Sequence, residues 1–190
     1  AKRLALCLLV GLLLLACLPA ARAAQTVDVY VDGKLVTWTD AKPFVNADDR
    51  TMVPLRAVAE AMGLNVTWLG ERNTAEFTGC RSTAAGKQYD VCVYFQIGSM
   101  QLGATYRPWE TGKVQVYNEN MDTAPVETGG RTYAPIRFLA ERFGYQVRWD
   151  GAKNAAYLTS GNLDLEPDGP VRMDVADGVY PAYIYRDLIQ

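Results

Sequence analysis

The sequence has 190 residues, with 19 basic and 21 acidic side chains, no histidine and a formal net charge of −2. Nucleic acids and anionic lipids select basic surfaces, so this composition disfavours both as partners. Without histidine, the usual Ser-His-Asp and Cys-His catalytic arrangements, HExxH zinc sites and imidazole copper sites are excluded. We therefore expect a protein that is not an enzyme and has no cofactor.

Residues 1–23 are predicted to be a signal peptide. Two basic residues precede an apolar run from Leu4 to Leu18, and Ala21-Arg22-Ala23 has the form of a secretory cleavage site. Cleavage would remove three basic residues and no acid, which leaves 16 against 21 and a net charge of −5. We expect a secreted or cell-surface protein without a membrane span after cleavage. Lipoprotein anchoring through Cys17 is the less favoured alternative.

The first predicted unit, residues 24–79, opens with a β-hairpin. Apolar residues alternate with polar ones from Val27 to Val31, and Asp32-Gly33-Lys34 follows as a tight turn. The unit ends in a further strand before Cys80. This alternation predicts a half-buried sheet at the start of the mature chain.

The stretch from Arg50 to Gly63 predicts a strand that turns into a helix. A residue before proline is pushed toward extended geometry, whereas Pro54 is preorganised for the first helical position. Apolar residues then recur at helical spacing until Gly63, which should end the helix. Beyond it the apolar period changes to two, and we expect Trp68 to cover the helix against the sheet.

Two cysteines, Cys80 and Cys92, remain in the predicted mature chain. An even pair in an oxidising compartment predicts a disulfide, which would close a short loop and contribute about 3 kcal/mol. The alternative is a pair of buried reduced thiols. A long strand with clean alternation is predicted for residues 88–98.

The strand-and-helix motif returns in the second predicted unit, residues 80–160, at a constant offset of 81 positions. The duplication predicts an α+β fold of two repeats, each an antiparallel β-sheet packed around one short α-helix. The matched structural residues are Pro54 and Pro135, Arg56 and Arg137, Glu60 and Glu141, Gly63 and Gly144, and Trp68 and Trp149.

An insertion is predicted at residues 101–120, because the hairpin of the second unit matches the first at a smaller offset than the helix does. This segment lacks the pattern of a buried element and contains Tyr106 and Trp109, which we regard as candidate ligand-binding aromatics. The competing interpretation is that aromatic residues in a small β-rich domain belong to the core.

The arginine and glutamate pairs of the helices stand four residues apart. Arg56 with Glu60, and Arg137 with Glu141, predict solvent-facing ion pairs worth a few tenths of a kcal/mol. A second interpretation is that the arginines fold back to cap loop carbonyls, and the sequence does not separate the two. A ligand-binding or catalytic role for these charges is the third.

Carboxylates offer little catalytic or metal-binding chemistry. Asp48 and Asp49 are adjacent on a predicted turn and point apart, which disfavours a paired-carboxylate hydrolase. The acidic run from Asp164 to Gly169 resembles a calcium loop, but Val175 stands where the bidentate glutamate is required. Residues 161–190 are therefore predicted to be an acidic, Gly- and Pro-containing tail.

The residues Asp32-Gly33-Lys34, Arg50 to Gly63 and Val66-x-Trp68 resemble the copper amine oxidase N-terminal domain-like family, also called the stalk domain. The resemblance extends to about Thr159 in two tandem copies. It implies an antiparallel sheet around a helix, in an accessory module common in exported bacterial envelope proteins. In the oxidases, copper and quinone belong to a separate catalytic domain with histidine ligands. No functional residue is carried over, because the matching motif is structural.

We therefore expect an exported, non-catalytic accessory or structural module of the bacterial cell envelope. Its expected partner is a cell-wall polymer or another envelope protein. The alternative is a binding module for cell-wall glycan or peptide, in which Tyr106 and Trp109 contact the ligand.

Overall fold

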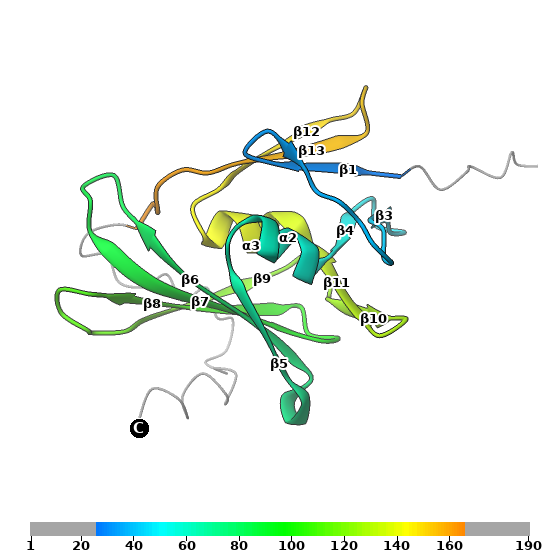
Figure 1. The fold of residues 1–190 in the computed structure, drawn as a ribbon. Coiled ribbons are helices and arrows are strands. Elements are labelled where there is room, and N and C mark those ends of the chain that lie inside the picture. The colour runs from blue at the N-terminus through cyan, green and yellow to red at the C-terminus, as the bar shows by residue number, and fades with distance from the viewer. Residues whose placement is uncertain (1–25, 166–190) are drawn as a thin grey trace, which may run out of the picture.

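The structure is a computed structural model and describes residues 26–165. Within this range the chain forms three β-sheets, two α-helices and a short 3-10 helix, η1 (Gly70–Arg72). Both α-helices lie between the sheet that contains β12 and β13 and the larger sheet of β6 to β8 (Figure 1). The predicted signal peptide, with Cys17, and the tail beyond residue 165 lie outside the described residues.

Each α-helix begins directly after a proline, as the sequence predicts. Helix α2 spans Leu55–Ala61 and helix α3 spans Ile136–Arg142. Pro54 and Pro135 keep extended ψ angles of 108° and 120°, so they are the last strand residues and not the first helical ones. The predicted apolar stripe is confirmed by the buried side chains Leu55, Val58 and Ala59 in α2, and Ile136, Leu139 and Ala140 in α3.

Both helices end at a glycine in the left-handed region, Gly63 with φ of 71° and Gly144 with φ of 77°. In each case the glycine N–H donates to the carbonyl oxygen three residues earlier. The next N–H donates to the carbonyl oxygen five residues earlier, so Leu64 donates to Ala59 and Tyr145 donates to Ala140. These are the two bonds of a Schellman cap. The predicted helix ends are confirmed.

The strands that feed the helices pair with each other. Strands β4 (Thr51–Pro54) and β11 (Arg131–Pro135) run antiparallel in the centre of one sheet, with β3 (Phe44–Val45) and β10 (Val126–Thr128) outside them. This sheet therefore takes strands from both predicted repeats.

A second sheet has the order β12, β13, β1, β2. Its strands are β12 (Gln146–Asp150), β13 (Ala155–Thr159), β1 (Asp28–Val31) and β2 (Lys34–Leu35). The predicted hairpin between β1 and β2 is confirmed, with Asp32 and Gly33 at φ of 48° and 78°. However, β1 pairs parallel with β13, which lies near the end of the second predicted repeat.

The third sheet is antiparallel, in the order β5 to β9. Its strands are β5 (Asn65–Leu69), β6 (Thr74–Ser82), β7 (Gln88–Gln96), β8 (Gln101–Pro108) and β9 (Gln115–Asn120). Strand β7 confirms the long strand predicted at residues 88–98. Strands β8 and β9 occupy the predicted insertion, so the expectation that residues 101–120 hold no buried element is wrong. Leu102, Ala104 and Tyr106 alternate into the core.

The described residues form an α+β fold, but the expected division into repeats with separate sheets is not observed. All three sheets combine strands from residues 24–79 and 80–160, and one buried cluster contains residues from both ranges. The hairpins also differ, because β1 runs parallel to β13 whereas β7 runs antiparallel to β6. The segment after β13 adds a further link, since Leu163 N–H donates to Ser82 O.

The two tryptophans do not cover the helices as expected. Trp68 and Trp149 have exposed fractions of 42% and 43%, whereas Val66 and Val147 pack partly against the core.

Candidate functional site

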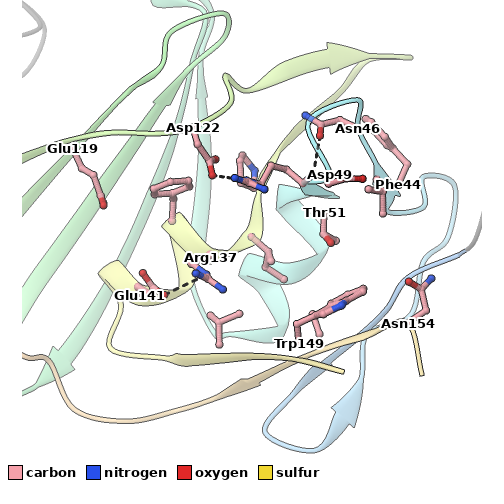
Figure 2. A pocket seen from close by; sticks show the side chains of 17 residues that line it. Phe44, Asn46, Asp49, Thr51, Glu119, Asp122, Arg137, Glu141, Trp149 and Asn154 are labelled. Atoms are coloured by element: carbon pink, nitrogen blue, oxygen red, sulfur yellow. Dashed lines mark hydrogen bonds and ion pairs between the residues drawn. The ribbon is translucent and has the colours of Figure 1, made fainter. Parts of the chain in front are cut away.

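A groove with a volume of about 1110 Å³ lies beside α3. It is bounded by the turn between β3 and β4, the start of α3 and the inner face of β12 and β13 (Figure 2). Its charged lining residues are Asp49, Arg50, Glu119, Asp122, Arg137 and Glu141, and its aromatic lining residues are Phe44, Phe138 and Trp149.

The upper wall of the groove is built by an ion pair between the two predicted repeats. Arg50 donates from Nε to Asp122, on the loop after β9. Asn46 fixes the turn that carries Arg50, because its Oδ1 accepts the backbone N–H of Arg50 at 2.9 Å and its Nδ2 donates to Thr123 at 3.1 Å. These bonds connect the turn between β3 and β4 to the loop after β9.

The corresponding arginine pairs in the reverse direction. Arg131, 81 residues after Arg50, donates to Asp40 in the first half of the chain. Each arginine thus binds an aspartate of the other half. In the sequence, an aspartate precedes each of these arginines: Asp40 stands ten positions before Arg50, and Asp122 stands nine positions before Arg131. The two aspartates are 82 positions apart, so a comparison at a constant offset of 81 does not align them.

Helix α3 supplies the second charged pair of the groove. Arg137 Nε and Glu141 Oε1 are 3.6 Å apart, which agrees with the predicted ion pair (Figure 2). The equivalent residues of α2, Arg56 and Glu60, form no ion pair within residues 26–165. Of the two helices, only α3 therefore carries a paired guanidinium and carboxylate, and this pair lies beside the groove.

Trp149 contributes the exposed aromatic surface of the groove. It projects from β12 on the side opposite Arg137 and Glu141, with Asn154 beyond it (Figure 2). Asn154 has φ of 50° and donates from Nδ2 to Thr26 O at 2.8 Å, which fixes the turn before β13. Trp149 is thus a flat apolar surface between polar groups.

A partly buried cluster lies at the end of the groove marked by Glu119. Arg142 stands 4.2 Å above the ring of Tyr117 and 3.7 Å from Glu119. Burial raises the pKa of Glu119, and Arg142 opposes that shift. Burial also raises the pKa of Tyr106 to about 12, with Arg142 again acting in the opposite direction.

The two predicted ligand-binding aromatics, Tyr106 and Trp109, differ in exposure. Tyr106 is only 4% exposed and donates its hydroxyl to Arg142 O at 3.2 Å, so its role as an accessible ligand contact is corrected to a core role. Trp109 is 61% exposed and donates from Nε1 to Asp90 at 2.9 Å. This bond and Arg107 hold the pKa of Asp90 below its usual range.

The predicted disulfide is absent from the structure, where neither Cys80 nor Cys92 is joined to another cysteine. They lie on neighbouring strands, but Cys80 is opposite Asp90 and Cys92 is opposite Thr78. Diagonal neighbours of this kind are about 7–8 Å apart, with a somewhat shorter Cβ–Cβ distance, whereas a disulfide requires Cβ atoms about 4 Å apart. The two thiols instead donate to Gln88 and Glu76.

The acidic turn residues have structural bonds. Asp48 accepts from Thr123 and from Asn46, while Asp49 has φ of 57° and lines the groove. Among residues 26–165, no three His, Cys, Asp or Glu side chains gather in a way suited to a metal ion. In the same range, no helix has the length and apolarity needed to cross a membrane.

A family model described as the copper amine oxidase N-terminal domain matches residues 30–158. No curated protein and no solved structure matches the chain. The matched range begins in β1 and ends in β13, two strands that pair directly, and the rings of Tyr30 and Tyr157 stack at 4.9 Å. The first and last strands of the matched range are therefore neighbours in one sheet.

Proposed function

This chain belongs to the copper amine oxidase N-terminal domain family, and from that premise we propose that it is an exported, non-catalytic accessory module of the bacterial cell envelope. In this proposal, two copies of the family motif are interlocked in one rigid body. Such a body is suited to holding other parts of an envelope assembly at a fixed separation.

The reciprocal exchange between the two halves is the observation that carries this proposal. Arg50 binds Asp122 and Arg131 binds Asp40, while β4 pairs with β11 at the centre. Exposed ion pairs contribute little stability on their own, but here they connect loops that the central sheet already holds together. Relative motion of the halves would break the sheet.

Export and rigidity are tested separately. A fusion of the chain to alkaline phosphatase, which is active only outside the cytoplasm, should be active with residues 1–23 and inactive without them. Limited proteolysis of the mature protein should leave the range 26–165 uncut. Activity of the fusion without residues 1–23 would contradict export, and two stable fragments cut near residues 83–87 would contradict the single body.

A second candidate function is binding of a cell-wall polymer through exposed aromatic residues. Trp109 and Trp149 are the exposed indoles that favour it, since one has an exposed fraction of 61% and the other lines the groove. Retention on purified cell wall should fall in Trp109→Ala or Trp149→Ala if either residue carries the binding. Failure of the wild-type protein to bind would exclude this function and leave the structural role untouched.

A further inference from the structure

We propose that the groove beside α3 binds an extended polypeptide segment, which adds as a strand to the free edge of β12 and places a basic side chain over Trp149. This inference goes beyond the proposed structural role and does not depend on it. Its occupant is a protein segment of extended conformation that carries lysine or arginine.

Strand β12 is an edge strand within residues 26–165, and the hydrogen bonds of its neighbour fix which of its backbone groups are free. Asp28 N–H donates to Asn154 O and Asp32 N–H donates to Leu158 O. Alternate residues of a strand direct their backbone groups to opposite sides. Residues 154, 156 and 158 therefore face β1, and residues 155, 157 and 159 face β12.

The register then assigns the remaining groups of β12. Residues 155, 157 and 159 lie opposite Asp150, Arg148 and Gln146, which consequently bond to β13. Val147 and Trp149 must direct their N–H and C=O groups away from the sheet, toward its open edge. Unpaired backbone groups at an edge are the groups that an added strand uses.

The same two residues also face the groove with their side chains. Val147 and Trp149 both line it, and Trp149 is 43% exposed. A strand added to β12 would thus place alternate side chains in the groove, against the indole and α3. Backbone pairing and side-chain recognition coincide at one position.

Charge selects the kind of peptide. Four carboxylates line the groove against two guanidinium groups, and the guanidinium of Arg142 lies 3.7 Å from one of the four, Glu119, which leaves a local net charge of −1. Arg50 is bound to Asp122 and Arg137 to Glu141, so Asp49 is a carboxylate in the lining for which no ion pair is formed within residues 26–165. A basic side chain would find the acidic surplus and could lie over the face of Trp149 as a cation–π contact.

Strand β5 provides a matched control within the same molecule. Trp68 has nearly the same exposed fraction, 42%, at the equivalent position of an edge strand, but it does not line the groove. Binding that requires only an edge strand and a tryptophan would occur at both places. Binding that requires the acidic groove would occur at β12 alone.

The experiment is an NMR titration of the full mature chain with the peptide acetyl-Thr-Val-Lys-Val-Thr-amide. We expect shifts in the amides of Val147 and Trp149 and in the Trp149 indole N–H. A peptide with glutamate in place of lysine should bind more weakly. Trp149→Ala should weaken binding about 3- to 30-fold, the range of a cation–π contact, and Trp68→Ala should leave it unchanged.

Strand addition is tested on the peptide, which avoids any effect on protein folding. N-methylation removes a backbone donor, so methylation at residues facing β12 should abolish binding and methylation at the alternate residues should not. Equal losses at both sets would overturn the proposal. It would also be overturned by no shifts at residues 146–150, by preference for N-acetylglucosamine oligomers over the peptide, or by self-association through β12.

Discussion

Val53 and Ala134 lie directly opposite each other in the central pair of strands, and both side chains are fully buried. The two residues are 81 positions apart, the offset of the predicted repeat, and each precedes the proline after which a helix begins. On either side of this pair, Tyr133 lies opposite Pro54 and Pro135 lies opposite Met52, so the two prolines occupy equivalent places in the pairing. Each strand thus meets its own counterpart.

This contact predicts strong coupling between the two positions. Val53→Ala should cost about 2 kcal/mol from lost burial and a cavity, and Ala134→Val should cost about 1–3 kcal/mol from overpacking. The double variant restores the summed volume, so its loss should be smaller than the sum by about 0.5–3 kcal/mol. Urea unfolding of the four proteins measures this, and strict additivity would contradict the packing across the centre.

The two helix-ending glycines should respond unequally to the same substitution. A Cβ at Gly63 meets nothing within 4 Å, whereas a Cβ at Gly144 would stand 2.9 Å from the backbone of Asn162. Gly63→Ala should therefore cost about 1 kcal/mol from its positive φ alone. Gly144→Ala should cost about 1–3 kcal/mol more, because backbone must move.

Chemical denaturation of both variants gives the comparison, with Gly63→Ala as the control for backbone strain. Equal losses would show that the segment at Asn162 does not pack on the end of α3.

The helices were predictable because their signals are local. Pro54 and Gly63, with apolar residues between them, determine where α2 starts and ends, and the same holds for Pro135 and Gly144. The pairing of β1 with β13 was not predictable in this way, because it joins residues about 127 positions apart with no local signal for a parallel register. Long-range pairing depends on the whole core.

The groove was not predictable from the sequence for a similar reason. Arg50 and Asp122 are 72 positions apart and approach only in the folded chain, and the 43% exposure of Trp149 depends on packing that its spacing does not report. The burial of Tyr106 was not predictable with certainty, because the small residues Gly103 and Ala104 weaken the alternation of large apolar side chains in β8. Spacing alone does not report which face of a strand is covered.

The cysteines should remain reduced in the native protein. Their diagonal register predicts identical intact masses with and without reductant, and faster labelling of the exposed Cys80 than of Cys92 by a thiol reagent. A mass increase of about 2 Da on reduction, the mass of two hydrogens, would restore the disulfide inferred from the redox compartment.

Tyr106 should make the protein sensitive to alkaline pH. Its pKa is about 12 in the folded state, against about 10 for an unperturbed tyrosine, so the unfolded state releases its proton first. The contribution of Tyr106 to stability is therefore present below about pH 10 and is lost as the pH rises toward about 12, by about 2–3 kcal/mol in total.

Stability measured against pH for the wild type and Tyr106→Phe isolates this effect. The phenylalanine variant should lose less stability over that interval, although it lacks the hydrogen bond to Arg142 O at every pH. Parallel curves would show that Tyr106 titrates normally and is not buried.

Hydrogen exchange followed by mass spectrometry, in a series of low denaturant concentrations, tests the interlocked body most directly. Peptides that cover β1, β4, β11 and β13 should lose protection together, with one opening free energy, because each sheet contains strands of both halves. Protection that persists in β5 to β7 after β11 to β13 have exchanged would contradict a single body and indicate two halves that open independently.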